Sequence, residues 1–365
     1  MLGRWLPGCC GLWLACLAAL PAPAQTLHLI LPTENEALLS EDGPSFYQYT
    51  DRYFERRRSR PWQGGQYGFV RNPKRTRQGI VYTRFHEGVD IRPVRRDADD
   101  EPLDPVRAID DGEVVYANRV EDHSNYGLYV VVEHWWGGAP FYTLYAHLNT
   151  VAVRPGQRVR QGDVLGRLGY TGVGINRRRA HVHFEINLLL NRDFQSWYDT
   201  HFKPDDVNHH GIYSGFNLAG LDVPALYLAL RDDPDLSLPA FIARQEPYVT
   251  VTVPADGMLD LLWRYPWLSP EANPWLLRYG DAPLPAAWTF TFDQSGLPLR
   301  IEPAAPVKEP RIEVFAEAPL DYRYVTDGLL SGTDRRTVTL SRQGRRYLDL
   351  LTRPYRQPSY RRVEW

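Results

Sequence analysis

The sequence predicts a mainly β protein, on the evidence of its turn content, its aromatic content and a series of short strand-like segments. The 365 residues include 30 Pro and 28 Gly, which favour many turns over long helices. Aromatic residues make up 13% of the chain and include 22 Tyr, a residue type that is enriched in strands. The hydrophobic content of 43%, the charged content of 24% and the formal net charge of -2 are ordinary for a globular protein. This balance excludes a disordered or collagen-like chain and gives no basis for general nucleic-acid binding.

Residues 1–24 are expected to be a signal peptide. An apolar run from Leu12 to Leu20 precedes Pro21-Ala22-Pro23-Ala24-Gln25, which offers an Ala-x-Ala cleavage site. The run is shorter than the ~20 residues needed to span a membrane, so cleavage is favoured over a membrane anchor. We therefore expect an exported protein with no membrane span after cleavage, periplasmic or alternatively secreted. All three Cys residues lie in this segment, so the mature chain is expected to form no disulfides.

The remainder of the chain divides into three parts by composition. Residues 25–64 form an N-terminal extension in which Phe46, Tyr49 and Tyr53 have the spacing of a short helix. Residues 65–220 contain apolar runs bounded by Gly, Pro, Asn or Asp, and these runs are read as the strands 113–117, 128–133, 141–146, 163–166 and 181–186. Residues 221–365 are punctuated by Pro and include nine arginines between Arg335 and Arg362. This last part is expected to be a second, mainly β domain of unassigned role.

The most informative local pattern is the pair His181 and His183. Alternate side chains of a strand share one face, so both imidazoles would project together, with their Cα atoms ~6.6 Å apart. Two imidazoles on one face are half of a metal site. Taken alone, the pair is explained equally well by two surface histidines.

A second pattern, His86-Glu87-Gly88-Val89-Asp90, begins like the helical metal-binding motif His-Glu-x-x-His. Gly88 and the β-branched Val89 disfavour a helix. In a straight strand, His86 and Asp90 would lie ~13 Å apart, too far to share one ion. The sequence therefore predicts a bend at Gly88. A carboxylate with two imidazoles and no thiolate suits Zn²⁺ with an open fourth position, as in catalytic zinc sites.

A third pattern, Tyr145-Ala146-His147-Leu148, places an imidazole at the end of a strand. The segment from about Gln66 to Asn187 contains these patterns in one particular order. In this order it resembles the lysostaphin-type, LytM-like zinc endopeptidases, which cut peptidoglycan peptides. The matching residues are His86 and Asp90, Tyr145 to Leu148, Thr171-Gly172, His181 to Ile186, Tyr67 to Pro73, and Ser124 to Gly127. The chain departs from the family pattern in a longer loop at 174–180 and in an inserted Trp-Trp-Gly-Gly at 135–138.

The resemblance implies an antiparallel β-sheet zinc peptidase domain with one Zn²⁺ per chain. It implies that His86, Asp90 and His183 hold the metal, which activates a water and polarises the scissile carbonyl. His147 and His181 are then the catalytic residues. One of the two would act as general base and proton shuttle and the other would stabilise the oxyanion, and the sequence does not assign which is which.

The implied partners are peptidoglycan stem peptides. Asn125 and Tyr126 belong to a motif that matches the family ahead of the central strand, and they are candidate substrate-binding residues. Arg177, Arg178 and Arg179 precede His181 and are candidates to bind the free carboxylates of diaminopimelate-containing stems. A pentaglycine bridge offers no such carboxylate, so the D-Ala to diaminopimelate cross-link is the preferred substrate.

Two other functions are alternatives to this one. Some proteins with this fold lack ligands and instead activate amidases, so a catalytically inactive cell-wall adaptor is the main alternative. All five metal and catalytic positions are filled here, which favours an enzyme. A carbohydrate-active enzyme would need a pair of carboxylates facing a sugar groove, and Glu87 and Glu185 are the only acids in the motifs besides Asp90. The sequence assigns no oligomeric state.

Overall fold

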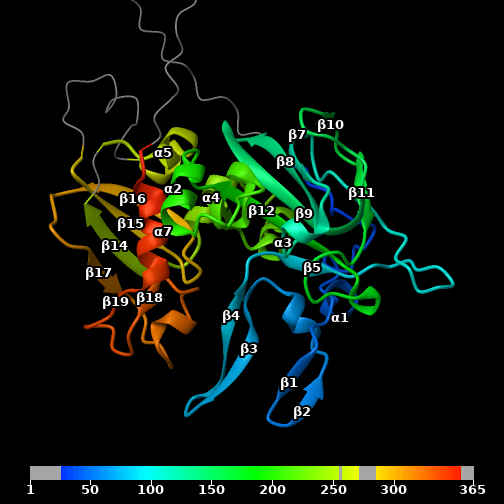
Figure 1. Ribbon diagram of the computed structural model, residues 1–365, viewed down its shortest axis with the longest axis horizontal. Helices are drawn as coiled ribbons and strands as arrows, with labels where there is room; N and C mark the ends of the chain where they lie inside the picture. The colour runs from blue at the N-terminus through cyan, green and yellow to red at the C-terminus, as the bar shows by residue number, and fades with distance from the viewer. Residues whose placement is uncertain (1–25, 255–256, 271–284, 355–365) are drawn as a thin grey trace, which may run out of the picture.

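The computed structural model describes residues 26–254, 257–270 and 285–354, and a nine-stranded antiparallel sheet lies at its centre (Figure 1). The strands of one path lie in the order β10, β7, β8, β9, β11 and β6, and β12 pairs with β9, β5 and β13. Their bounds are β5 Val89–Ile91, β6 Pro105–Arg107, β7 Gly112–Asn118, β8 Leu128–Trp136, β9 Ala139–Val151, β10 Arg158–Val159, β11 Val164–Leu168, β12 Val182–Leu189 and β13 Leu218–Gly220. The predicted mainly β, antiparallel fold is confirmed. The expected signal peptide lies outside the described residues.

Strand β12 illustrates how the sequence sets the two faces of this sheet. Val182, Phe184 and Ile186 alternate along the strand and are fully buried in the main hydrophobic core. Phe184 packs there against Tyr145 of β9, with ring centroids 5.1 Å apart. The intervening His183 consequently projects from the opposite face, where only a small apolar cluster lies beneath it. This second face carries the polar site.

A long hairpin precedes the central sheet and extends away from it (Figure 1). It consists of β3 (Gly68–Thr76) and β4 (Gly79–His86), which pair in an antiparallel register that sets Gly68 opposite His86. The chain then bends at Glu87 and Gly88 before β5 begins. The bend predicted at Gly88 is therefore confirmed.

The N-terminal extension contains helix α1 (Gly43–Phe46), the hairpin of β1 (Arg52–Phe54) and β2 (Arg57–Ser59), and the 3-10 turn η1 (Trp62–Gly65). The helix ends at Phe46, and Tyr47 is already extended. The helical interpretation of the aromatic spacing after residue 46 is thus wrong. The reason is pairing with β5, because Tyr47 forms a bridge with Ile91, and the backbone N–H of Gln48 donates to the carbonyl of Asp90 at 2.8 Å.

The C-terminal part combines a four-stranded antiparallel sheet with helices. The sheet has the order β16, β15, β14 and β17, with bounds β14 Val249–Pro254, β15 Ala287–Phe292, β16 Pro298–Ala304 and β17 Arg311–Val314. The helices are α3 Val223–Asp232, α4 Leu238–Ala243, α5 Asp260–Arg264 and α7 Arg342–Thr352, and the short strands β18 Leu330–Ser331 and β19 Thr339–Leu340 precede α7. Pro224 and Pro239 lie in the first turns of α3 and α4. Proline is favoured there because its missing N–H would have no helical partner, so these prolines start helices rather than mark turns.

The C-terminal part packs directly on the end of β12. Buried side chains of both parts belong to one continuous hydrophobic core. Tyr265 accepts a hydrogen bond from the N–H of Leu189 at 3.0 Å, and the guanidinium of Arg264 donates to the carbonyls of Leu189 and Leu190. The expected domain boundary near residue 221 remains a prediction. Within the described residues, no helix combines the length and apolar character of a membrane span.

Candidate metal centre and active-site cleft

The candidate metal ligands come from three positions that the sheet brings together. His86 is the last residue of β4, and Asp90 lies two residues beyond the bend at Gly88. His183 lies directly opposite Asp90 in the antiparallel pairing of β12 with β5. The register of this strand pair therefore joins residues that are 93 positions apart in the sequence.

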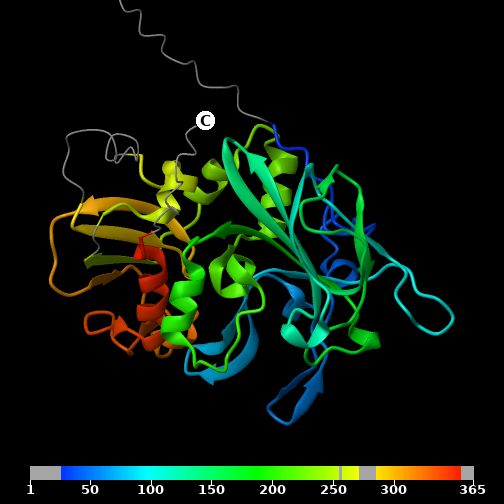
Figure 2. The same ribbon diagram turned by 45° about the horizontal axis from the view of Figure 1, so that its top comes forward.

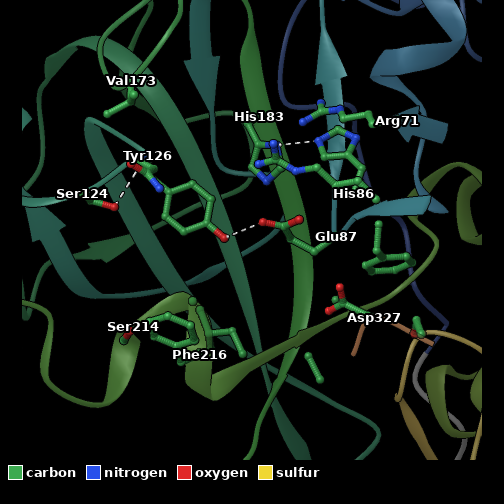
Figure 3. A pocket seen from close by; sticks show the side chains of 18 of the residues that line it. Arg71, His86, Glu87, Ser124, Tyr126, Val173, His183, Ser214, Phe216 and Asp327 are labelled. Carbon is green, nitrogen blue, oxygen red and sulfur yellow. Dashed lines mark hydrogen bonds between the residues drawn. The ribbon is translucent and has the colours of Figure 1, made fainter. Parts of the chain in front are cut away.

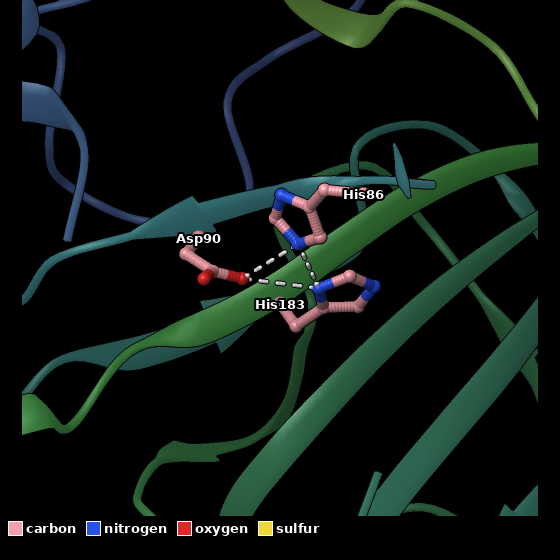
Figure 4. A group of neighbouring side chains, drawn as sticks. All are labelled: His86, Asp90 and His183. Carbon is pink, nitrogen blue, oxygen red and sulfur yellow. Dashed lines mark hydrogen bonds and ion pairs between the residues drawn. The ribbon is translucent and has the colours of Figure 1, made fainter. Parts of the chain in front are cut away.

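The three donor atoms form a tight triangle (Figure 4). Nε2 of His86 lies 3.0 Å from Nδ1 of His183, and Oδ1 of Asp90 lies 3.1 Å from each of these nitrogens. Donors around a tetrahedral zinc ion lie roughly 3.3 Å apart, given bonds of ~2.0–2.1 Å. All three side chains are buried, with at most 4% of each residue exposed.

Hydrogen bonds on the outer side of each imidazole decide which nitrogen carries its proton. Nδ1 of His86 donates to the carbonyl of Gln66 at 2.7 Å, and Nε2 of His183 donates to the carboxylate of Glu185 at 2.7 Å. The other nitrogen of each ring faces Asp90. These two nitrogens and a carboxylate oxygen converge on one point, and a metal cation such as zinc fits there in place of a proton.

The electrostatics of the triangle also favour a bound positive charge. Burial alone would raise the pKa of Asp90, but His86, His181 and Arg71 hold it well below its usual range. Burial would likewise lower the pKa of His183, whereas hydrogen bonds with Asp90 and Glu185 raise it to about 10. A proton and a metal ion compete for the same lone pairs, so this raised pKa indicates an affinity for cations.

His181 and His147 lie beside the triangle. Nε2 of His181 is 3.4 Å from Oδ1 of Asp90, and its Nδ1 donates to the carbonyl of Arg179 at 2.6 Å. The ring centroids of His147 and His181 are 4.8 Å apart. Burial, together with the neighbouring His181 and His183, lowers the pKa of His147 well below its usual value. His147 is therefore neutral near pH 7 and can accept a proton.

A β-bulge turns His147 toward this face. The pairing of β8 with β9 shifts between the pairs Leu128–Leu148 and Val130–Tyr145, so β9 holds one extra residue there. Tyr145 and Leu148 both point into the main core. His147 has φ +60°, a left-handed conformation that non-glycine residues seldom adopt, and its Nδ1 donates to the carbonyl of Thr171 at 2.9 Å. In a regular strand His147 would share the buried face of Tyr145.

Two contacts at this site were not anticipated from the sequence. Nη2 of Arg71 pairs with Oδ2 of Asp90 at 2.6 Å, so this arginine holds the carboxylate that faces the histidines. The hydroxyl of Tyr126 donates to Glu185 at 2.8 Å and lies 3.2 Å from Glu87 (Figure 3). The sequence does not reveal the contact of Arg71, because this contact depends on the register of the β3–β4 hairpin. Glu185 is 1% exposed and bonded to His183, so the acids do not form the open pair that a glycosidase requires.

The site opens into a cleft of about 1630 Å³. Of the predicted substrate-binding residues, Asn125, Tyr126 and Arg179 line this cleft. Arg177 and Arg178 are not among its lining residues. Arg177 instead pairs with Glu101 at 2.7 Å and donates to the carbonyl of Asp99.

Comparison with known protein families assigns the central part of this chain. Residues 84–195, which include all five candidate metal and catalytic residues, match the model of peptidase family M23. This segment is a peptidase family M23 domain. The predicted resemblance to LytM-type peptidases is confirmed.

Relatives share only parts of the chain. It is 32% identical to the peptidoglycan DD-endopeptidase ShyB of Vibrio cholerae over 43% of this chain and 33% of that protein. It is 41% identical to the cell division protein DipM of Caulobacter vibrioides over 22% of this chain and 12% of that protein. The chain thus spans a third or less of these relatives. The catalytic domain of lysostaphin from Staphylococcus simulans aligns with 20% identity and a TM-score of 0.27, over 54% of this chain and 98% of that domain.

The cleft is built only partly by the M23 domain. Several residues outside 84–195 also line it. They include Arg71 and Asn72 of β3, Phe216, and Asp327 and Arg346 of the C-terminal part. Glu87 and Asp327 project into the same space (Figure 3). Burial, together with the nearby Glu87, raises the pKa of Asp327 to about 7. The C-terminal part therefore contributes a wall to the cleft of the M23 domain.

Substitution of Gly88 by alanine is expected to disturb the metal centre. A Cβ atom at this position would lie 2.6 Å from the carbonyl oxygen of Phe184 and 2.7 Å from Cγ of Glu185, both on β12. The bend and β12 would have to separate, which typically costs about 1–3 kcal/mol of folding stability. We expect a lower midpoint in denaturant unfolding and at least a tenfold weaker metal affinity, measured by competitive titration.

A matched control for this prediction is Gly138→Ala in the turn between β8 and β9. Gly138 has φ +79°, but no atom lies within 4 Å of its added Cβ. This variant should lose stability through backbone strain alone and keep its metal affinity. Equal metal affinity in both variants would contradict the close-packing argument.

Proposed function

We propose that this chain is an exported zinc metalloendopeptidase that hydrolyses peptide cross-links of bacterial peptidoglycan. The observation that carries the proposal is the convergence of Nε2 of His86, Nδ1 of His183 and Oδ1 of Asp90 within 3.1 Å of one another, with neutral His147 alongside. A domain of peptidase family M23 contains all of these residues. The relative ShyB is named a peptidoglycan DD-endopeptidase, which supports this class of substrate.

In this proposal, His86, Asp90 and His183 hold one zinc ion. When bound, zinc supplies Lewis-acid chemistry, because it acidifies a water molecule and polarises the scissile carbonyl. Gln66 and Glu185 keep the two ligand imidazoles in the tautomers that bind a metal. These positioning contacts are already present in the protein.

His147 and His181 carry the proton transfers. Each donates its Nδ1 proton to a backbone carbonyl, so Nε2 is the ring nitrogen that remains for proton transfer. One of the two accepts the proton of the attacking water and delivers it to the leaving amine, and the other stabilises the developing oxyanion in its protonated form. The shared tautomer does not distinguish the two assignments.

The proposed substrate bond is the D-Ala to diaminopimelate cross-link. Asn125, Tyr126 and Arg179 line the cleft and are the proposed contacts with the stem peptide. Arg177 and Arg178 stay outside the cleft, so the basic loop contributes only Arg179 to this proposal. Export to the periplasm follows from the expected signal peptide and from the location of peptidoglycan.

Digestion of purified peptidoglycan sacculi tests this proposal. The purified, zinc-loaded protein should convert cross-linked dimers into monomers, seen by mass spectrometry of the released muropeptides. The same assay with a pentaglycine-bridged substrate should show little cleavage. Full zinc occupancy with intact dimers on both substrates would refute the enzyme and favour the inactive adaptor.

A further inference from the structure

Helix α7 (Arg342–Thr352) brings a pair of arginines to the cleft from the C-terminal part. It packs beside α2 (Phe194–His201), the helix that follows β12 (Figures 1 and 2). Trp197 of α2 donates to the carbonyl of Arg346 at 2.8 Å, which fixes the two helices together. Arg342 and Arg346 are four residues apart, so they lie on one face of α7, and both line the cleft.

Neither arginine has a carboxylate partner among the residues that the structure describes. By contrast, Arg71, which also lines the cleft, forms an ion pair with Asp90. Asp327 also lines the cleft. In the described structure it forms no ion pair with Arg342 or Arg346. The Nε–H of Arg346 is shielded from solvent, and the described residues offer it no hydrogen-bond acceptor. A buried donor without an acceptor is unfavourable unless a ligand supplies one.

The position of these charges is also unfavourable for the helix. Arg342 is the first residue of α7, so its charge lies at the positive end of the helix dipole. Like charges four residues apart on a helix repel each other. Burial and the charge of Arg342 lower the pKa of Arg346. An anion bound between the two side chains would offset both the unfavourable interaction with the helix dipole and the repulsion between the arginines. The arrangement is thus better suited to binding an anion than to stabilising the helix.

Aromatic rings hold Arg346 in place and connect it to the metal centre. Its guanidinium lies 4.4 Å from the ring centroid of Phe202, and Phe202 packs on Phe216 at 5.3 Å. Gly215, next to Phe216, approaches the ring of Tyr126 so closely that an added Cβ would lie 3.0 Å away. Tyr126 in turn contacts Glu185, the partner of the ligand His183. A continuous wall therefore runs from the site to the arginine pair.

We infer that Arg342 and Arg346 form a carboxylate-binding subsite that holds a free carboxylate of the stem peptide. This inference rests on the proposed function and assigns part of the substrate recognition to the C-terminal part. The planar guanidinium of Arg346 can bind a carboxylate with two parallel hydrogen bonds, and Arg342 adds a second charge from the same side. Phe202, whose ring centroid lies 4.4 Å from Cζ of Arg346, restricts the position of the guanidinium.

The test compares two soluble cross-linked dimers, one with free stem carboxylates and one with these carboxylates amidated. The wild-type protein should show a lower KM for the free form. The double variant Arg342→Gln with Arg346→Gln should raise that KM roughly tenfold, with kcat and the KM for the amidated dimer nearly unchanged. The control Arg345→Gln removes the same kind of charge from α7, outside the cleft lining, and should retain the wild-type preference.

Equilibrium binding gives a readout that does not depend on catalysis. Calorimetric titration with an uncross-linked stem tetrapeptide should show roughly tenfold weaker binding by the double variant, and amidation of the peptide should weaken binding to the wild-type protein alone. Thermal unfolding of the double variant should occur at or above the wild-type temperature, because a repulsion is removed. The charge-conserving variant, with lysine at both positions, should keep part of the preference for free over amidated carboxylates. It replaces the glutamine variant in the test if that variant does not fold.

The outcomes separate this inference from the proposed function. Cleavage of dimers by the wild-type protein, with equal KM ratios and equal binding in the double variant, would overturn the subsite and leave the function intact. Absence of cleavage by the wild-type protein would refute the function. In that case, weaker tetrapeptide binding by the double variant than by the wild-type protein would still support the subsite. Equal binding by the two proteins would overturn it.

Discussion

Replacement of Asp90 by asparagine is expected to remove metal binding and hydrolysis together. The substitution keeps the shape of the side chain but removes the charge that faces His86 and His183. It also leaves the guanidinium of Arg71 without its carboxylate partner. Loss of an outer-shell partner costs about 10–100-fold in metal affinity or activity, and loss of a charged ligand should cost more. Metal content by mass spectrometry, measured together with dimer cleavage, checks this expectation.

The Asp90→Asn variant needs a control for folding. Glu185→Gln provides a graded comparison, because it weakens one hydrogen bond to His183 and leaves all three ligands in place. It should reduce metal affinity by about 10–100-fold without abolishing binding. Circular dichroism should show native secondary structure in both variants. Retention of stoichiometric zinc by Asp90→Asn would show that the ligand set is wrong.

Replacement of His147 by asparagine is expected to leave the metal bound and to lower kcat by about 10²–10⁴-fold. Asparagine is the suitable substitute because it tolerates the left-handed backbone of this position, φ +60°, better than alanine does. The change removes the neutral imidazole next to His181 and retains the three ligands. Steady-state kinetics on a soluble cross-linked dimer, with metal analysis of the same sample, measures the effect.

His209→Asn is the matched control for this second variant. His209 is exposed, stacks on His123 with ring centroids 3.8 Å apart, and is not among the residues that line the cleft. Its activity should stay within a few-fold of the wild type. If His147→Asn also lost its metal, His147 would be a ligand, and the division between ligands and catalytic residues would have to change.

The sequence could predict features that depend on neighbouring residues. The need for a bend between His86 and Asp90 follows from strand geometry alone, and the structure places that bend at Glu87 and Gly88. The shared face of His181 and His183 follows from strand alternation, and both side chains lie within 3.4 Å of Oδ1 of Asp90. The resemblance to a known family then predicted that these separate patterns form one site.

Other features depend on contacts between distant segments and could not be predicted in this way. The bulge that reorients His147 arises where β9 pairs with β8, and no local pattern marks it. The pairing of Tyr47 with Ile91 overrides the helical spacing of the N-terminal aromatics. Arg342 and Arg346 reach the cleft only because α7 packs against α2, about 150 residues earlier in the chain, as the contact from Trp197 to Arg346 shows.

The pairing of the N-terminal extension with β5 determines whether the sheet has an exposed edge beside the metal centre. β5 is three residues long, with β12 on one side and residues 46–48 on the other. The carbonyl of Asp90 accepts from Gln48, and the N–H of Arg92 donates to the carbonyl of Phe46. Removal of residues 26–65 would leave these backbone groups unpaired at a strand edge, which is a template for pairing with another chain. A truncated protein would therefore tend to self-associate through β5, so a loss of activity after truncation has to be separated from aggregation at this edge.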